Sequence, residues 1–311
     1  MKRLFGLFLA AALLLSGCAG KELEAEAELF AMDTYMYFRV WGKDAQEGLS
    51  RTEALIREME RDWSPSEEDS IPSRLSRGEA ADPDEEAQAF LQAVEDLSRQ
   101  TGGTFDPHMG AVSAAWGFRD GNYRVPTAEE LALARAMETL DVGGALKGYA
   151  GQRAAEALEA LDIDRAVLNL GGNVQTFGEK PDGEPWMIAI QDPWGGDGQA
   201  GVLRVTGTAS VVTAGSYQRY FEQGGKRYHH ILDPETLCPA ESGLAAVTVV
   251  CADGLKADVY STALFVMGLE RGAEFWRENR DFEAVFLLEN GAVYATEGAA
   301  LSGCAFEVIG G

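Results

Sequence analysis

Helix and strand patterns are distributed unevenly along this chain, and that distribution constrains the fold most. After residue 165, short apolar or β-branched runs alternate with turn residues, which is typical of strands in a sheet. These runs are 166–170, 186–191, 203–205, 210–213, 246–251 and 284–288. The first half instead favours helices, apart from a strand expected over 30–40. Patterns segregated in this way predict an α+β fold, with a mixed or antiparallel sheet and flanking helices.

The expected helices have recognisable faces and ends. Leu55, Ile56, Met59 and Trp63 share one helical face, and 90–97 repeats the pattern. Further helices are expected over 127–140, where a capping box starts the helix, over 147–161, and over 255–268. The polar stretch 64–83 is expected to be loop. No internal repeat or low-complexity linker divides the 311 residues, so we expect a single two-lobed domain.

The N-terminus has the pattern of a targeting segment. Lys2 and Arg3 precede an almost wholly apolar run, 4–15, and Cys18 follows the small residues Ser16 and Gly17. This arrangement resembles the lipobox of bacterial lipoproteins, in which the cysteine is lipidated; a plain secretory signal with a chance cysteine is the alternative. We therefore expect residues 1–17 to be a signal peptide, 18–29 a tether and 30–311 the folded domain. The resulting protein would be lipid-anchored to the cell membrane, facing the periplasm or the cell exterior.

Charge and cysteine content exclude several classes of protein. Fifty acidic and 26 basic residues give a net charge of −24, which argues against nucleic acid as a partner. Cys238, Cys251 and Cys304 show no metal-ligand spacing, and their odd number leaves at least one thiol without an intramolecular partner.

Three glycine-rich turns adjoin expected elements. They lie in the segments 140–150, 168–173 and 213–217. Glycines at such junctions let backbone N–H groups approach an anion, and a helix starting near Lys147 would direct its positive end the same way. None of the three has the spacing of a Rossmann or Walker motif. Each could also be an ordinary tight turn.

Two further patterns point to chemistry. Asp258 and Thr262 are four residues apart on an expected helix, so their oxygens face one side and suit Mg²⁺ or Ca²⁺. A solvated aspartate and a helical threonine are the alternative, but the apolar residues that follow indicate a buried helix. His229 and His230 are adjacent, so only one can enter a given site if the segment is extended. A general base, a phosphate ligand and a structural histidine all remain open.

Seven motifs, in this order, resemble the ApbE family of lipoproteins, the FAD:protein FMN transferases. The motifs are AMDTYMYF, TGGTFDPHMGAVSAAWGF, LDVGGALKGYA, AVLNLGGNVQTFG, VVTAGSYQRYF, RYHHILDPET and ADVYSTALFVMG. The resemblance extends over nearly the whole chain after the signal peptide, from about residue 30 to residue 304. The resemblance implies the ApbE fold, which is T-fold-like. Departures from the family pattern include Leu237 in place of a turn glycine and Trp63 in place of a commoner tyrosine.

The resemblance also implies a reaction and its residues. A threonine or serine hydroxyl of a target protein would attack the FMN-side phosphorus of FAD, forming a phosphoester and releasing AMP, with Mg²⁺ as cofactor. By similarity Mg²⁺ is held by Gly144, Asp258 and Thr262, and His230 assists proton removal or steadies the diphosphate. Contacts to FAD are implied for Met32, Trp63, Thr104, Phe105, Asp106, Asp141, Lys147 and Ile231.

The resemblance does not identify the acceptor protein, and it leaves alternatives to the transferase function open. Acceptors would be FMN-binding domains of membrane redox complexes or of extracellular electron-transfer proteins. Two other functions fit the same residues. An FAD pyrophosphatase would let water replace the target hydroxyl, and a lipid-anchored flavin-binding protein would bind FAD without turnover.

Overall fold

The computed structural model describes residues 23–79, 81–196 and 198–311, and it is built around one large sheet. The sheet has nine strands in the order β1-β2-β3-β4-β7-β10-β11-β12-β14, and only the β12–β14 pair is parallel. Its strands are β1 (Glu24–Ala31), β2 (Thr34–Trp41), β3 (Arg165–Asn169), β4 (Asn173–Phe177), β7 (Ala209–Gly215), β10 (Leu244–Cys251), β11 (Phe282–Leu288), β12 (Val293–Thr296) and β14 (Glu307–Ile309).

Two smaller sheets accompany it. One has the order β13-β6-β5 and the other is the β8–β9 hairpin. Their strands are β5 (Trp186–Gln191), β6 (Gln199–Val205), β8 (Tyr220–Gln223), β9 (Lys226–His229) and β13 (Leu301–Ser302). The helices are α1 (Ala45–Trp63), α2 (Ile71–Ser76), α3 (Glu85–Gln100), α4 (Gly110–Ala115), α5 (Ala128–Arg135), α6 (Gly143–Glu159) and α7 (Gly254–Asn279).

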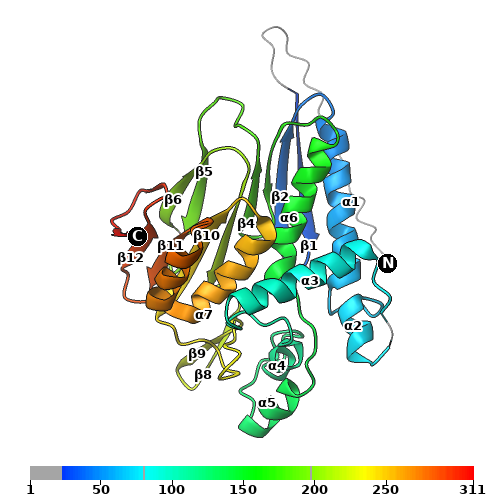
Figure 1. Ribbon diagram of the computed structural model, residues 1–311, viewed down its shortest axis with the longest axis vertical. Coiled ribbons are helices and arrows are strands. Elements are labelled where there is room, and N and C mark those ends of the chain that lie inside the picture. The colour runs from blue at the N-terminus through cyan, green and yellow to red at the C-terminus, as the bar shows by residue number, and fades with distance from the viewer. Residues whose placement is uncertain (1–22, 80, 197) are drawn as a thin grey trace, which may run out of the picture.

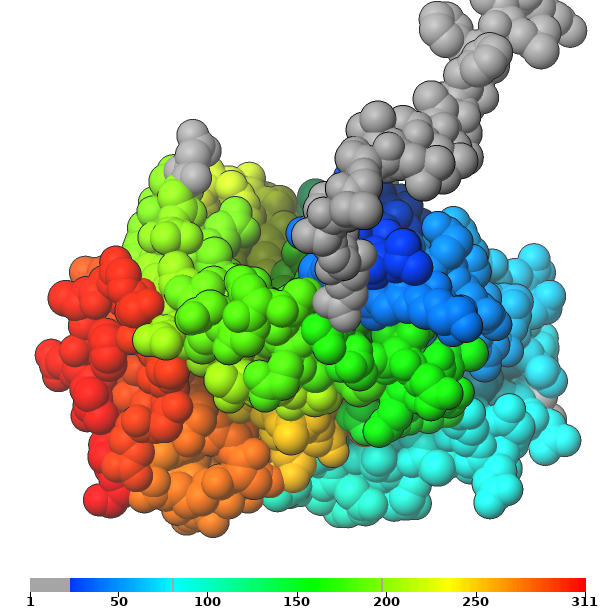
Figure 2. Space-filling view, turned by 90° about the horizontal axis from the view of Figure 1, so that it is seen from above, coloured from blue at the N-terminus to red at the C-terminus, as the bar shows by residue number. Residues whose placement is uncertain are grey.

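The large sheet separates two apolar cores. On one face α1, α6 and α7 pack over the strands, as Figure 1 shows, and bury a core that includes Phe38, Leu168 and Phe265. On the other face the β13-β6-β5 sheet covers the strands, with Trp186 against Trp41. The space-filling view in Figure 2 shows the N-terminal and C-terminal segments on opposite sides of the molecule, as their places in the strand order require. This arrangement confirms the expected α+β class.

The expected strand over 30–40 is instead two strands. Met32 and Asp33 have φ of 50° and 58°, so the backbone reverses there and forms the β1–β2 hairpin. The hairpin begins at Glu24, so the segment expected as a tether, 18–29, contributes most of β1. Arg39 stabilises this acidic strand through ion pairs with Glu24 and Glu26. The signal peptide and Cys18 lie outside the described residues.

Several helix boundaries also differ from expectation. Helix α7 breaks at its expected end, where Gly268 has a φ of 75° and a ψ of −176°, but a second helical segment follows and runs to Asn279. The capping box at Thr127 is confirmed, but α5 ends at Arg135 rather than near residue 140. The expected loop 64–83 contains the short helix α2, with Ser70 as its N-cap. Among the described residues, no helix has the length and apolar character needed to cross a membrane.

A second lobe lies below the sheet in Figure 1 and consists of α4, α5 and the β8–β9 hairpin. It has its own apolar cluster, which includes Trp116, Phe118 and Leu131. Phe221 of β8 stacks between Tyr123 and Tyr228, with ring centroids 5.4 and 5.1 Å away. In Figure 1 the second lobe lies at the end of the main sheet where the β1–β2 turn is found and where α6 begins.

Candidate active site

The site is built where α6 crosses α7. Gly148 and Gly254 face each other, and a Cβ added at Gly148 would lie 2.0 Å from the Gly254 carbonyl oxygen. Only glycine permits so close an approach of two helix backbones. This contact brings the first turns of α6 against the residues of α7 that follow its N-terminus.

Asp258 lies buried at this crossing, with 4% of its surface exposed. Its Oδ2 accepts a hydrogen bond of 2.8 Å from the backbone N–H of Gly148. Burial raises the pKa of the Asp258 carboxyl above its ordinary value, although the Lys147 charge and the N–H groups of Gly148 and Lys147 oppose that rise. A cation bound nearby would stabilise the charged form of this buried carboxylate.

The residues expected to hold Mg²⁺ lie together. Gly144 has non-helical dihedrals, φ −87° and ψ 18°, which kink the first turn of α6. A Cβ placed on Gly144 would be 3.2 Å from Thr262 Oγ1, so that hydroxyl lies against the kink. The N–H that an undistorted helix would direct at the Gly144 carbonyl belongs to Gly148, and it donates to Asp258.

Carboxylate, hydroxyl and backbone carbonyl are the hard oxygen donors that Mg²⁺ prefers, so this set fits the ion. The described residues contain no group of three or more His, Cys, Asp or Glu side chains that could hold a metal. The protein thus supplies one carboxylate at this site. The remaining coordination positions of a bound Mg²⁺ would suit phosphate oxygens and water.

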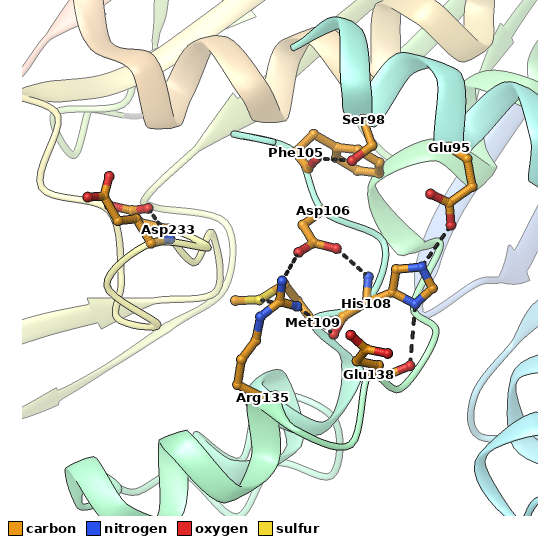
Figure 3. Close-up of polar contacts among 10 residues, drawn as sticks. Glu95, Ser98, Phe105, Asp106, His108, Met109, Arg135, Glu138 and Asp233 are labelled. Carbon is orange, nitrogen blue, oxygen red and sulfur yellow. Dashed lines mark hydrogen bonds and ion pairs between the residues drawn. The ribbon is translucent and has the colours of Figure 1, made fainter. Parts of the chain in front are cut away.

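The loop 104–109 closes one side of the site. The Phe105 ring lies beside Gly144, 3.1 Å from where a Cβ would stand, and the Phe105 carbonyl accepts a bond from Ser98. One carboxylate oxygen of Asp106 accepts a hydrogen bond from the His108 backbone N–H within the loop, and the other pairs with Arg135 of α5 at 2.6 Å (Figure 3). The carboxylate of Asp106 therefore shapes the loop in this structure.

His108 fastens the same loop to its surroundings. One ring nitrogen lies 2.7 Å from Glu95 of α3 and the other 3.3 Å from the Glu138 carbonyl (Figure 3). Arg135 adds contacts to the His108 carbonyl and the Met109 sulfur. The sequence offered no signal for the Arg135 contacts, since Arg135 is 29 positions from Asp106.

The two adjacent histidines face different surroundings. His229 is buried against Phe265, with its Nε2 3.1 Å from the Ala240 carbonyl. His230 places Nδ1 3.1 Å from the Arg219 carbonyl, so Nδ1 carries the hydrogen and Nε2 keeps a free lone pair. Burial, followed by the charges of Arg219, His229 and Lys147, lowers the pKa of His230 to about 3. Its imidazole is therefore neutral at pH 7.

Three of the other residues expected to contact FAD lie on separate elements. Met32 lies in the β1–β2 turn and donates its N–H to Glu60 of α1, one turn before Trp63. Trp63 is buried and packs edge-on against Phe90, with ring centroids 4.7 Å apart. Asp141 accepts a bond from Gly143 at the start of α6. Their roles stay predictions.

The remaining expected residues hold the site's borders. Thr104 bonds the Thr101 carbonyl, and Ile231 is buried directly after His230. Leu237, where the resemblance expects glycine, has a φ of 60°, so the position keeps the left-handed conformation that favours glycine. Cys238, Cys251 and Cys304 are free thiols.

Comparisons with known proteins place these residues in a family. The model of the ApbE family matches residues 32–286. An FAD:protein FMN transferase of Klebsiella pneumoniae (strain 342) is 35% identical over 224 residues, covering 65% of this chain and 68% of the relative. One of Treponema pallidum (strain Nichols) is 28% identical over 325 residues, covering 90% of each chain.

Solved structures agree with the family model. The ApbE protein of Thermotoga maritima has a TM-score of 0.82 at 29% identity, covering 88% of this chain and 97% of its own. The flavin transferase ApbE of Vibrio cholerae has a TM-score of 0.78 at 25% identity, covering 89% of this chain and 98% of its own. The sequence motifs, the helix crossing and these matches lead to one conclusion: this chain belongs to the ApbE family.

Proposed function

We propose that this protein is an FAD:protein FMN transferase that uses Mg²⁺. The observation that carries the proposal is the buried carboxylate of Asp258 beside the Thr262 hydroxyl and the Gly144 kink, with a neutral histidine in the adjoining lobe. The type of reaction is the one in the names of the relatives, FAD:protein FMN transferase. The acceptor hydroxyl forms a bond to the FMN-side phosphorus, the bridging P–O bond breaks, and AMP leaves with the bridging oxygen.

Asp258, Thr262 and the Gly144 carbonyl are the residues that would hold Mg²⁺. Bound there, the ion would neutralise charge on the FAD diphosphate. The chain contributes the rigid helix crossing, which fixes these three oxygens relative to one another without a flexible loop. The Lys147 ammonium supplies a further positive charge at the first turns of α6, where the helix dipole also favours an anion.

His230 is suited to take the proton of the attacking hydroxyl. Its Nδ1–H donates to the Arg219 carbonyl, which fixes the ring and leaves Nε2 as the proton acceptor. The neutral ring that the low pKa ensures is the form that can accept a proton. Negative charge on bound FAD would raise the pKa of His230 and make Nε2 a stronger base.

The acceptor and the location belong to the same proposal. We expect a partner with an FMN-binding domain, from a membrane redox complex or an extracellular electron-transfer protein. Removal of residues 1–17 and lipidation at Cys18 would anchor the enzyme on the cell membrane, facing the periplasm or the exterior. Radiolabelled fatty acid should label the wild type in cells and leave a Cys18→Ser variant unlabelled.

Product analysis with and without an acceptor domain tests the function. A transferase releases AMP in step with flavin bound to the acceptor and produces little free FMN. Free FMN and AMP in equal amounts, with the acceptor unmodified, would instead support the FAD pyrophosphatase. Reaction in ¹⁸O-water separates the two chemically, because only hydrolysis introduces solvent oxygen into a product. If FAD stayed intact under every condition, the result would support a flavin-binding protein without catalytic activity.

A further inference from the structure

Arg219 lies directly opposite His230 on the hairpin that carries the histidine. The β8–β9 ladder pairs Tyr220 with His229, and the next rung is a 3.1 Å hydrogen bond from the His230 N–H to the Arg219 carbonyl. Residues directly opposite in an antiparallel pair project their side chains to the same face, with Cβ atoms about 5 Å apart. The guanidinium of Arg219 and the imidazole of His230 thus leave the hairpin on one side.

That face is the one turned toward the second lobe's aromatic cluster. Phe221 and Tyr228, each two residues from Arg219 or His230, stack on each other within this cluster. Phe118 approaches His230 with ring centroids 6.5 Å apart. Arg219 therefore projects toward the His230 side of the hairpin, and the opposite face carries His229 against α7.

The other arginine of the hairpin provides a contrast. Arg227 projects to the opposite face, where it pairs with Glu222 and covers the Tyr220 ring at 4.2 Å. Arg219 is exposed and has no carboxylate partner in the part of the chain that the structure describes. Lys147 also lacks an ion pair among those residues, and the charges of Lys147 and Arg219 both reach the His230 ring. Both positive charges therefore act on one imidazole, in a protein with a net charge of −24.

We propose that Arg219 binds the diphosphate of FAD beside His230. An arginine presents a rigid fork that matches two phosphate oxygens at once, and it stays charged at every working pH. Bound by Arg219, the diphosphate would be held next to His230, the residue proposed to take the proton of the attacking hydroxyl. This inference rests on FAD being the substrate.

The test compares Arg219→Met and Arg219→Lys with a matched control, Arg227→Met, which removes an arginine from the same hairpin's other face. FAD binding is measured from flavin fluorescence, and AMP release is measured with an acceptor domain present. We expect Arg219→Met to lower kcat/KM for FAD by about 10- to 100-fold, the usual range for a charge-assisted contact. Arg219→Lys should show a smaller decrease in kcat/KM. Added guanidinium ion should partly restore the activity of Arg219→Met, and Arg227→Met should match the wild type.

Two results would overturn the assignment. One is an Arg219→Met enzyme that binds and turns over FAD as Arg227→Met does. The other is a loss that guanidinium does not restore and that comes with a lower melting temperature, which would show a structural role. A wild type that binds FAD but modifies no acceptor would count against the transferase function alone, because the FAD affinities of the variants still decide the role of Arg219.

Discussion

Asp258 Oδ2 accepts a 2.8 Å hydrogen bond from the Gly148 N–H, 110 residues earlier in the chain. This bond joins α7 to α6 at the point where the two helix backbones are closest. It also directs the carboxylate toward the kinked first turn of α6, where Gly144 and Thr262 meet. The proposed metal site thus depends on the helix crossing, and changes at the crossing should alter stability and activity in separable ways.

Asp258→Asn should remove activity without harming the fold. The amide oxygen can still accept the Gly148 bond, and a buried neutral group costs less than a buried charge, so the melting temperature in metal-free buffer should not fall. AMP release should drop by at least about 100-fold, since outer-shell metal partners alone are worth about 10- to 100-fold and Asp258 would be a direct ligand.

Thermal unfolding with and without Mg²⁺ separates the two effects. Mg²⁺ should raise the melting temperature of the wild type by binding the folded state, and it should leave Asp258→Asn unchanged. Asp281→Asn, which alters an exposed carboxylate paired with Lys256, is the matched control. An Asp258→Asn enzyme with full activity would refute the metal site.

Thr262→Val keeps the side-chain shape and removes only the hydroxyl. We expect a higher Mg²⁺ concentration for half-maximal activity and a loss of activity of about 10- to 100-fold. Thr262→Ser restores the oxygen and should recover most of the activity. If valine and serine behaved alike, the hydroxyl would have no part in metal binding.

Gly148→Ala should unfold the protein more easily. The new methyl group would lie 2.0 Å from the Gly254 oxygen and 2.7 Å from Asp258 Cβ, so the helices must move apart. The expected cost is about 1–3 kcal/mol in the free energy of unfolding, measured by urea titration. Gly310→Ala is the control, because no heavy atom lies within 4 Å of its added Cβ. Equal stability of the two variants would contradict the close crossing.

His230 should make the protein less stable in acid. Its pKa is about 3 in the folded state and about 6.5 in an unfolded chain, so the unfolded state binds a proton first. Stability from this residue is complete above pH 6.5 and is lost as the pH falls toward 3. Thermal unfolding from pH 7 to pH 4.5 should therefore show a smaller loss for His230→Gln than for the wild type. Parallel curves would mean that His230 titrates normally.

The sequence predicted the fold class, the longer helices and several strands because their signals are local. The capping box at Thr127 and the strand patterns after residue 165 depend on neighbours within a few positions, and the structure confirms both. The β1–β2 turn was missed because Met32 and Asp33 adopt left-handed dihedrals without a glycine. The helix does break at Gly268, where its end was expected, but the second helical segment of α7, which follows the break, was missed.

The site was only partly predictable, because local sequence patterns do not report contacts between distant segments. Helical spacing placed Asp258 and Thr262 on one face, but the pattern alone could not show that Gly148 and Gly254 press the two helices together. Arg135 lies outside the seven motifs, and Arg219 lies inside one of them without a pattern that marks it as a ligand. The contacts of Arg135 with Asp106 and of the Arg219 carbonyl with His230 depend on how the chain folds.

Mass spectrometry of an FMN-binding acceptor domain is the most direct test of the central claim. The domain is incubated with FAD and the mature protein, in Mg²⁺ or in EDTA, with Asp258→Asn in parallel. We predict a mass gain of one FMN less water for the wild type in Mg²⁺ only, matched by released AMP. A gain that persists in EDTA or in Asp258→Asn would contradict a metal site at the α6–α7 crossing, and FAD cleavage without any gain, with every acceptor domain tried, would contradict the transferase.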